Sequence, residues 1–498
     1  MQRPVPLTRD LVLVGGGHAH ALVLRRWGMS PLPGARLTLI NPAPTAPYTG
    51  MLPGYVAGHY GRDAVEIDLV RLARFAGARL ILGIASGIDR DARLVHVGGW
   101  APLRYDTVSL DVGVSSDLPG IPGFQSHAAC AKPMGPFAER WSRYCADVQR
   151  GKADPHVAVI GAGVAGVELA LAIHHRLSAF GGPRVTLIEA GQALAGLAGN
   201  TRAILFERLR RADIRLIEGE GAAEVTADGV VTTAGRCVRA AFTVGAAGAK
   251  PFPWLADLGL AHEGGFLTVD ATLRSVTDGR VYASGDCAHL GFAPRPKAGV
   301  FAVRAAPTLY TNLRAELAGG PRRAFQPQRN YLKLISLGCQ EALADRSGMS
   351  VAGAWVWRWK DRIDRAFMDK LGKVPPMRRP PLPTPRAKGV SAAAGAQPPC
   401  AACGGKVGPG GLAAALAQLP PTTREDVLSR PGDDAAILRT GGATQVITTD
   451  HLRTFTEDPV VLARIATLHA LGDIWAMGAT PQAATATVIL PHMVPDMA

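Results

Sequence analysis

The chain has 498 residues, 47% of them hydrophobic and 19% charged, which excludes a disordered or fibrous protein and predicts more than one domain with a buried core. Seven cysteines are too few for a disulfide-rich secreted scaffold, and with no secretory signal they favour a reducing cytoplasm. The net charge is +14, but the basic residues are scattered without a nucleic-acid recognition motif, and no run of about eighteen apolar residues predicts a membrane-spanning helix.

A glycine-rich turn follows the first apolar run. Residues 11–14 read as a buried strand, Gly15-Gly16-Gly17 follows at once, and a helix-forming stretch comes next. Glycines at this place let the backbone approach a pyrophosphate, whose charge is held by the free N–H groups and positive end of the helix. His20 stands where such turns have a third glycine, and the next strand, residues 37–40, ends in Asn41 instead of an acid. The turn predicts a dinucleotide site, with a chance glycine cluster as the alternative.

A second turn carries the full motif. Gly161, Gly163 and Gly166 follow an apolar β-branched run and open a helix, and the next strand, residues 184–188, ends in Glu189. An acidic side chain at this place accepts hydrogen bonds from both hydroxyls of an adenosine ribose and repels a 2′-phosphate. The second turn therefore predicts binding of NADH in preference to NADPH.

A third segment supports the first turn. Residues 280–288 read as a strand that ends in Gly285-Asp286, and residues 296–304 read as the start of a helix. This pattern resembles the second flavin-binding signature of flavoproteins with two dinucleotide-binding domains. The resemblance implies that Asp286 contacts the ribityl chain of FAD and that the helix points its positive N-terminus at the flavin ring, with Lys297 as a further candidate for cofactor binding. A plain strand, turn and helix is the alternative.

Residues 8–372 as a whole resemble type II NADH dehydrogenase-like proteins. Residues 105–113 look like the strand that leaves the flavin domain, and residues 331–338 look like the opening of the C-terminal region. The resemblance implies hydride transfer from NADH to FAD. Since no paired-cysteine redox centre follows the first strand, electrons are expected to leave to an external acceptor, a quinone or a selenium species. The expected domains are an FAD domain (1–115 and 250–320), an NAD domain (116–249) and a C-terminal flavoprotein region (321–373).

Residues 355–371 have the pattern of an amphipathic helix. Apolar side chains recur every four residues, and basic residues fill the gaps. A membrane-surface anchor is one interpretation, because a basic helix with aromatic side chains binds at an anionic interface. A helix docked on its own domain or on a second subunit is the other. The apolar positions are Trp355, Trp359, Ile363, Phe367 and Leu371.

Residues 374–399 are rich in proline and small residues and read as a linker, after which a second module begins at Cys400. Cys400 and Cys403 form a CxxC pair, which would suggest zinc elsewhere, but no second ligand pair is present. Three further segments follow in the chain, Asp433-Asp434, Thr448–Asp450 and residues 464–479.

In this order and spacing, these segments resemble the N-terminal half of selenophosphate synthetase (selenide, water dikinase). The resemblance implies that Cys403 is the reactive cysteine and Lys406 the catalytic lysine. It also implies that Asp434 and Asp473 bind magnesium and that Asp450 lies beside the phosphates of ATP. These residue types suit the chemistry, because magnesium prefers carboxylate oxygens and a lysine neutralises a transferring phosphoryl group.

The chain is therefore expected to be an α/β protein with two Rossmann-like dinucleotide-binding domains, for FAD and NAD, and a partial α+β synthetase domain over residues 400–498. His469 departs from the synthetase family, which usually has Asn there. The second module lacks much of a complete synthetase, so we expect a fragment or a natural truncation that makes no selenophosphate alone. A redox-sensing flavoprotein that regulates selenophosphate synthesis, and a synthetase-like piece used only for dimerisation, are alternatives. A cytoplasmic homodimer, peripheral at the inner face of the membrane, is also expected.

Overall fold

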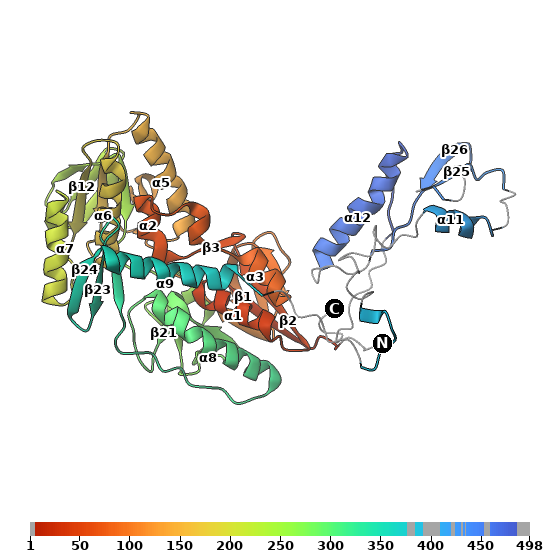
Figure 1. Cartoon of the computed structure of the whole chain (residues 1–498), viewed down its shortest axis with the longest axis horizontal. Coiled ribbons are helices and arrows are strands. Elements are labelled where there is room, and N and C mark those ends of the chain that lie inside the picture. The colour runs from red at the N-terminus through yellow and green to blue at the C-terminus, as the bar shows by residue number, and fades with distance from the viewer. Residues whose placement is uncertain are drawn as a thin grey trace. The chain divides into compact units, whose positions relative to one another are not determined.

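A computed structural model divides the chain into two compact units, residues 9–376 and residues 377–498 together with 1–8 (Figure 1). The structure describes residues 5–375, 384–391, 409–419, 424–429, 432–433, 435–452 and 459–485. None of the helices in this described part combines the length and the hydropathy needed to cross a membrane.

The first unit contains a five-stranded parallel sheet with strand order β20-β9-β1-β2-β5. We call this sheet and the helices that cover it the FAD half, and the second sheet and its helices the NAD half, after the cofactors predicted from the sequence. Its central strands are runs of Leu, Val and Ile, because strands buried on both faces need apolar side chains on both sides. Trp27 and Leu24 on α1 are buried against the sheet. The elements are β1 (Arg9–Val14), α1 (His18–Met29), β2 (Ala35–Asn41), α3 (Leu69–Ala76), β5 (Arg79–Leu82), β9 (Thr107–Leu110), β20 (Val281–Ala283) and α8 (Gly299–Ala318).

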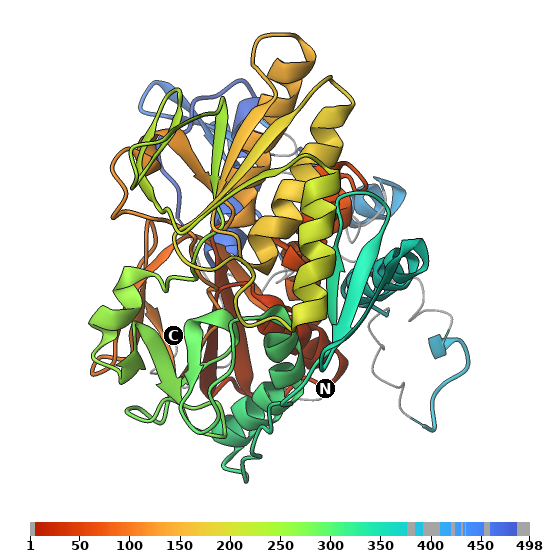
Figure 2. The same cartoon turned by 90° about the vertical axis from the view of Figure 1, so that its left-hand side faces the viewer.

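A second five-stranded parallel sheet, with strand order β10-β17-β11-β12-β13, forms the NAD half. The two sheets share one arrangement, since β11 pairs with β12 and β17 in the way that β1 pairs with β2 and β9. Figure 2 shows the helices of the NAD half (orange to yellow) beside their sheet, and α8 (green) in the FAD half. The elements are β10 (Ala128–Cys130), α5 (Met134–Gln149), β11 (His156–Ile160), α6 (Val164–Ser178), β12 (Arg184–Glu189), α7 (Gly199–Arg211), β13 (Arg215–Glu218) and β17 (Phe242–Gly245).

The C-terminal part of the first unit touches both halves. An antiparallel sheet of β22 (Lys333–Ser336), β23 (Ala342–Arg346) and β24 (Met349–Gly353) leads into α9 (Ala354–Gly372). The N–H of Ser336 donates to Glu168 on α6 at 2.7 Å. At the other end, Arg25 Nε on α1 donates to the carbonyl of Lys370 at 2.6 Å. The helix α9 therefore runs from the NAD half to the FAD half (Figure 1).

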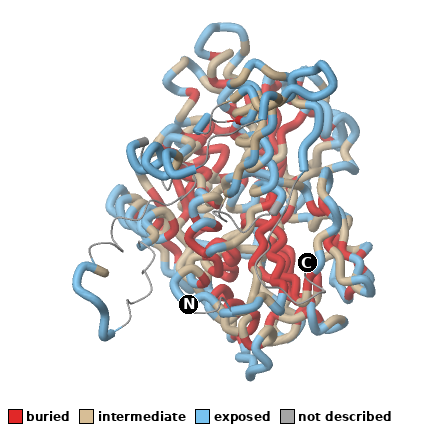
Figure 3. Tube along the Cα trace, turned by 90° about the vertical axis from the view of Figure 1, so that its right-hand side faces the viewer, coloured by how far each residue is buried: buried red, intermediate tan, exposed pale blue. Residues whose placement is uncertain are grey.

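The predicted amphipathic helix is present as α9, but its apolar stripe is divided. Trp355, Trp359 and Ile363 are 51%, 41% and 41% exposed, whereas Leu371 is 2% exposed. The C-terminal half of the stripe packs into the core of the FAD half, so that only the N-terminal half faces outward. Figure 3 shows the buried residues concentrated in the sheets and in the helices that cover them.

Smaller elements lie along the chain between the strands of the two large sheets. The antiparallel strands are β3 (Thr45–Pro47) with β4 (Glu66–Asp68), β6 (Ala85–Asp89) with β7 (Leu94–Val97) and β8 (Leu103–Arg104), β14 (Ala222–Thr226) with β15 (Gly229–Thr232) and β16 (Cys237–Arg239), and β18 (His262–Glu263) with β19 (Phe266–Val269), which pairs in parallel with β21 (Ala288–Leu290). The short helices are η1 (Thr49–Met51), α2 (Leu52–Ala57), η2 (Arg62–Val65), α4 (Phe124–His127), η3 (Pro253–Leu258) and η4 (Gly285–Cys287).

In the second unit, the described elements are α11 (Pro409–Leu416), β25 (Ala436–Thr440), β26 (Ala443–Ile447) and α12 (Pro459–Ala476). The strands form a hairpin through Gly441 and Gly442, both with positive φ, as a tight two-residue hairpin turn requires. Leu468 and Trp475 on α12 are each 52% exposed. These described elements leave much of their apolar surface uncovered.

Candidate functional site

The first glycine turn leaves no room for side chains. Gly15 has φ +91°, and a Cβ there would lie 2.5 Å from the carbonyl oxygen of Asp111. A Cβ on Gly17 would lie 2.4 Å from the carboxyl carbon of Asp111, so a substitution at either position must displace backbone or a buried side chain. The N–H of Gly16 donates to Oδ1 of Asn41 at 2.9 Å. This tight, bare turn at the start of α1 fits the pyrophosphate of FAD.

The second turn is built in the same way. Gly161 has φ +104°, and a Cβ on Gly166 would lie 1.8 Å from the carbonyl oxygen of Gly161, so any side chain there would push α6 away from β11. Glu189 at the end of β12 accepts the N–H of Ala162 at 2.7 Å and that of Gly191 at 3.0 Å. The turn and its acid fit the pyrophosphate and the adenosine ribose of NAD.

Asn41 and Glu189 make the same bond, each to the second residue of its turn, but they differ in charge. The amide of Asn41 is oriented by a second contact, because its Nδ2 donates to the carbonyl of Ala43 at 2.7 Å. A neutral amide does not repel a phosphate, whereas the carboxylate of Glu189 does. The predicted preference for NADH over NADPH therefore rests on the second turn alone.

The predicted Gly-Asp signature lies at the end of β20, in η4, where an ion pair joins the two halves. Lys132, which follows β10 of the NAD half, places its Nζ 3.1 Å from Oδ2 of Asp286. Their side chains are 34% and 16% exposed. No sequence motif marks Lys132 as a functional residue, and its partner lies 154 residues away in the chain.

The N-terminus of α8 lies beside His18 in the first turn. A Cβ on Gly299, the first residue of α8, would lie 3.2 Å from Nδ1 of His18. The His18 ring lies 5.2 Å from the ring of Tyr48 and 6.0 Å from that of Phe367 on α9. Burial lowers the pKa of His18, and the nearby Asp286 carboxylate opposes this shift. The positive end of α8 thus lies next to the first turn, as the flavin-binding signature requires.

Lys297 is engaged within the protein. Its Nζ donates to the carbonyl of Ala288 at 2.5 Å and lies 3.9 Å from the centroid of the Phe266 ring. Burial lowers the pKa of the ammonium. A contact between Lys297 and the flavin therefore stays a prediction.

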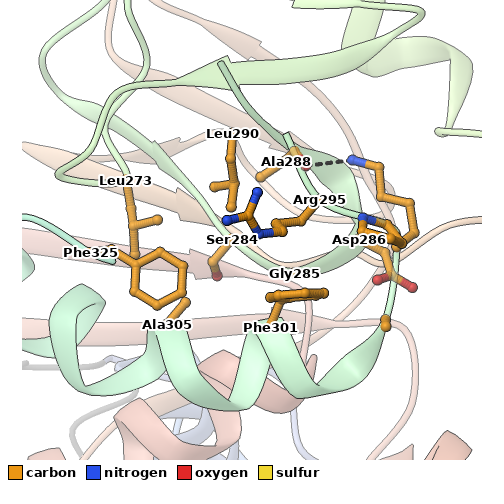
Figure 4. A pocket seen from close by; sticks show the side chains of 13 residues that line it. Leu273, Ser284, Gly285, Asp286, Ala288, Leu290, Arg295, Phe301, Ala305 and Phe325 are labelled. Carbon is orange, nitrogen blue, oxygen red and sulfur yellow. Dashed lines mark hydrogen bonds between the residues drawn. The ribbon is translucent and has the colours of Figure 1, made fainter. Parts of the chain in front are cut away.

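A small cavity lies behind the Gly-Asp turn (Figure 4). Its volume is about 30 Å³, room for about one water molecule, and Ser284, Arg295 and Phe301 are among the residues that line it. The hydroxyl of Ser284 is buried and has no hydrogen-bond partner within the described ranges of the chain. The cavity is too small for a flavin ring or a quinone, and this Ser284 hydroxyl in its largely apolar lining could bind a buried water.

A buried ion pair within α9 contacts the segment of Tyr48 and Gly50. Nζ of Lys360 lies 2.6 Å from Asp364 and donates to the carbonyl of Gly50 at 2.8 Å. The two charged residues are only 7% and 5% exposed. The hydroxyl of Tyr48 donates to the other oxygen of Asp364 at 3.0 Å, and the Tyr48 ring stacks on Phe367 with centroids 4.7 Å apart. Tyr48 thus links His18 to α9.

In the second unit, the candidate carboxylates lie close to polar partners. His469 Nδ1 lies 2.6 Å from Oδ2 of Asp450, and the hydroxyl of Thr448 donates to Asp473 at 3.1 Å. His469 and Asp473 are four residues apart on α12 and share one face of that helix. Thr448 and Asp450, which follow β26, therefore lie against the face of α12 that carries Asp473 and His469.

The other synthetase candidates, Cys400, Cys403, Lys406 and Asp434, lie outside the described residues. Within the described part, no group of three His, Cys, Asp or Glu side chains is arranged to hold a metal ion. The predicted magnesium ligands Asp434 and Asp473 therefore stay a prediction. Free thiols occur at Cys130, Cys145, Cys237, Cys287 and Cys339.

Comparison with known families agrees with this geometry. Residues 9–306 match the family described as pyridine nucleotide-disulphide oxidoreductase. The chain belongs to this family. Membership implies FAD and NAD(P)H as cofactors and confirms that the first unit is an oxidoreductase. Residues 432–498 match the N-terminal domain of AIR synthase related proteins, which confirms the second predicted resemblance at the level of the fold.

The C-terminal part is similar to proteins named selenide, water dikinase. It is 37% identical over 93 residues to the protein from Desulfitobacterium hafniense (strain Y51) and 39% identical over 100 residues to that from Pseudomonas straminea. Each alignment covers 18% of this chain, and they cover 27% and 28% of the two relatives. The chain thus spans about a quarter of the length of these curated relatives.

Solved structures resemble the first unit. The sulfide:quinone oxidoreductase from Aquifex aeolicus has a TM-score of 0.61 at 18% identity and covers 73% of this chain and 91% of its own. The NDH2 from Plasmodium falciparum in complex with NADH has a TM-score of 0.61 at 14% identity and covers 74% and 100%. At these identities the likeness shows the fold alone, and it confirms the predicted pair of Rossmann-like domains.

Proposed function

We propose that the first unit is an FAD-dependent NADH oxidoreductase that passes electrons to a small external acceptor, a quinone or a selenium species. The observation that carries the proposal is the junction of the two halves. The Lys132–Asp286 ion pair joins the end of β10 in the NAD half to the Gly-Asp signature of the FAD half. A nicotinamide held by one half and a flavin held by the other would meet at such a junction.

The residues of the chain would bind and orient the two cofactors. The turn at Gly15–Gly17 would hold the pyrophosphate of FAD, Asp286 its ribityl chain, and Glu189 the ribose of NADH. FAD, when bound, supplies an acceptor for a hydride. The N-terminus of α8 would stabilise negative charge on the flavin ring, because the helix dipole places a partial positive charge there.

The positions of the cysteines in the sequence support an external acceptor of electrons. Residues 42–60, which follow β2, contain no cysteine, so the chain has no dithiol pair near the first turn. Similar folds are named for different acceptors, a sulfide:quinone oxidoreductase in one case and a NAD-dependent persulfide reductase from A. fulgidus, with a TM-score of 0.57 at 21% identity, in another. These names support a quinone or a chalcogen species as acceptor.

The test is anaerobic reduction of the purified full-length chain by NADH, followed by timed reoxidation with a soluble quinone and, separately, with a selenium donor. We expect a yellow protein that NADH bleaches and that one of the two acceptors restores through repeated turnovers. A colourless protein that cannot be reconstituted with flavin would contradict the proposal. A redox sensor, the alternative, would be bleached slowly and show no sustained oxidation of NADH.

We also propose that the first unit makes peripheral contact with an anionic membrane through α9. Trp355 and Trp359 are exposed and stack with ring centroids 6.5 Å apart. Arg358 and Arg362 are exposed on the same helix. Aromatic and basic side chains together bind at the headgroup layer of anionic lipids.

For the second unit, we propose a nucleotide- and magnesium-binding part of a selenide, water dikinase-like module, which uses ATP and Mg²⁺. The proposal rests on the similarity to the named relatives and on the grouping of Asp450, His469, Thr448 and Asp473. In this proposal Asp434 and Asp473 would hold magnesium, Cys403 and Lys406 would serve the transfer chemistry, and selenide would be the substrate.

The test of this second proposal is magnesium-dependent binding of a fluorescent ATP analogue to the full chain. We expect Asp473→Asn to abolish the magnesium dependence. Asp426→Asn is the matched control, because Asp426 lies in the same unit but pairs with Arg424 on the surface. Equal binding by the Asp473 variant would contradict its role as a metal ligand.

A further inference from the structure

The two halves of the first unit differ at a buried position where their strands end. In the FAD half β1 pairs in register with β9, and in the NAD half β11 pairs in the same register with β17. The residue after β9 is Asp111, and the residue after β17 is Ala246. Counted from the two turns, His20 corresponds to Gly166. An apolar pair in the NAD half is thus replaced by two polar side chains in the FAD half.

The ring of His20, at the position of a glycine in the other turn, bonds to the backbone of its own turn. Nδ1 of His20 lies 2.7 Å from the carbonyl of Gly15, and Nε2 lies 2.8 Å from the hydroxyl of Ser109. Because a carbonyl only accepts, Nδ1 carries the proton and Nε2 accepts from Ser109. Burial lowers the pKa of His20 to about 4, so the ring is neutral and supplies no positive charge.

The carboxyl group of Asp111 lies between the two flavin-binding segments. Its Oδ2 accepts the N–H of Ala19 at 2.9 Å and that of His20 at 3.0 Å, at the positive end of α1. A Cβ on Gly17 would lie 2.4 Å from its carboxyl carbon, and a Cβ on Gly285 would lie 2.3 Å from its Oδ1. Asp111 is 3% exposed. It therefore lies at the same helix end that would hold the pyrophosphate of FAD.

The groups that face Asp111 do not compensate its negative charge. On η4, Asp286 is paired with Lys132, and burial raises the pKa of the Cys287 thiol to about 12, which keeps it neutral near Lys297. His20 on α1 is neutral, and Ser109 on β9 is uncharged. No salt bridge to Asp111 occurs among the residues that the structure describes. Burial raises the pKa of Asp111 to about 7, although its two backbone hydrogen bonds oppose the shift.

We propose that Asp111 couples FAD binding to proton uptake, so that the chain binds FAD with this carboxyl group protonated on Oδ1 and releases the proton when FAD leaves. The reason is competition, because an ionised carboxylate and a pyrophosphate repel each other and would share one positive helix end, where Asp111 is buried. Above about pH 7, where the carboxyl group of the flavin-free chain is ionised, one proton moves from solvent to Asp111 for each FAD bound. The inference rests on the proposed binding of FAD at the first turn.

The direction of the pH dependence follows from this coupling. Below about pH 7 the carboxyl is already neutral, so the affinity for FAD is constant. Above that pH a proton must be taken up with each FAD, and the affinity falls by up to about tenfold for each pH unit until the pKa of the loaded form is reached.

The test is titration of the flavin-free full chain with FAD between about pH 6 and pH 9, with binding measured by the quenching of flavin fluorescence. We expect the dissociation constant of the wild type to rise above pH 7 and that of Asp111→Asn to stay low and flat, because the amide keeps one oxygen for Ala19 and His20 and carries no charge. Asp106→Asn is the matched control, because Asp106 precedes the first residue of β9 whereas Asp111 follows the last. This variant should keep the pH dependence of the wild type.

Calorimetry gives a second readout. FAD binding near pH 8, measured in buffers of different ionisation enthalpy, should show uptake of about one proton in the wild type and none in Asp111→Asn. If Asp111→Asn does not fold, the double variant Asp111→Ala with His20→Gly, which copies the NAD half, replaces it with the same expectation. A flat wild type, or an equal slope in the variant, overturns the role of Asp111. A chain that binds no FAD at any pH overturns the flavin assignment instead.

Discussion

Glu189 and Asn41 occupy equivalent places at the ends of β12 and β2, and each accepts an N–H from its own turn. The backbone of the two turns is thus held in the same way, while the charge at the ribose end differs. A second pair of equivalent positions, Asp111 and Ala246, differs in the same manner. The two halves therefore share one backbone arrangement and differ in single side chains at equivalent positions, where we expect their dinucleotide sites to differ.

At the residue scale, Glu189→Gln should weaken the preference for NADH. The amide still accepts the N–H of Ala162, but it no longer repels a 2′-phosphate, so the ratio of kcat/KM for NADH to that for NADPH should fall by about tenfold or more, on the order of 1–2 kcal/mol. Steady-state oxidation of both nucleotides measures this. Glu218→Gln is the control, because Glu218 ends the next strand, β13, and accepts an N–H from Ala193. An unchanged ratio in the Glu189 variant would show that specificity lies elsewhere.

At the scale of one element, α9 divides its length between two environments. Its C-terminal half is packed against α1 and the Tyr48 segment through buried groups, and its N-terminal half presents Trp355 and Trp359 outward. A helix that was only an anchor would not need Lys360 and Asp364 in its buried face. The C-terminal half of α9 is therefore docked on its own unit, whereas membrane contact through the exposed N-terminal half stays a prediction.

The buried ion pair of α9 predicts a large loss of stability on removal of one partner. Lys360→Met leaves Asp364 as an uncompensated buried charge, and the free energy of unfolding should fall by about 3–5 kcal/mol. The double variant Lys360→Met with Asp364→Asn should recover most of the loss, because the amide still accepts from Tyr48. Thermal unfolding followed by circular dichroism measures both. A double variant no more stable than the single one would contradict this account.

The exposed end of α9 predicts binding to lipid. The full chain should sediment with anionic liposomes in a salt-sensitive manner, because the basic side chains act through screened charges. Trp359→Glu should reduce the bound fraction severalfold, since it places a negative charge among the anionic headgroups. Ile84→Glu changes an equally apolar side chain, 69% exposed and outside α9, and should have no effect. Unchanged sedimentation of the Trp359 variant would leave α9 as a structural helix only.

At the scale of the whole first unit, Glu168 lies where the NAD half meets the C-terminal region. Its Oε1 accepts the N–H of Ser336, and burial raises its pKa to about 7, although this hydrogen bond and the charge of Lys360 oppose the shift. Burying a neutral carboxyl group costs little while the unfolded chain also carries the proton at that group. Once the unfolded chain has released this proton, keeping it in the folded state lowers the free energy of unfolding. The junction of the parts is therefore sensitive to pH.

The sign of this effect gives a prediction. As pH rises from about 4.5 to about 7, the folded state binds more protons at Glu168 than the unfolded state, so the free energy of unfolding should fall, by at most about 3 kcal/mol from this group. Glu168→Gln should remove that part of the decline, and its melting temperature should exceed that of the wild type increasingly as pH rises. Glu224→Gln, at an exposed site, should follow the wild type. Parallel curves for all three chains would contradict the burial argument.

Sequence patterns alone were sufficient for the features that are local in the chain. The strands, the turns at Gly15–Gly17 and Gly161–Gly166, the Gly-Asp signature and the helix of residues 355–371 each depend on neighbouring residues, since strand, turn and helix are contiguous. The oxidoreductase family and its flavin and nicotinamide cofactors follow from those motifs, and the comparison with known families bears them out. The second module was also recognisable from residue order, although four of its candidate residues lie outside the described ranges.

Only the tertiary structure decided the contacts between distant segments. Lys132 meets Asp286 across 154 residues where the two halves join, and His20 on α1 meets Ser109 on β9 across 89 residues within the FAD half. A sequence pattern carries no record of such distances, so His20 read as a missing glycine until its bonds to Gly15 and Ser109 were seen. Tertiary packing also decides the burial of Lys360 and the charges that surround Asp111. The pKa of a group depends on every other group that packs around it in space.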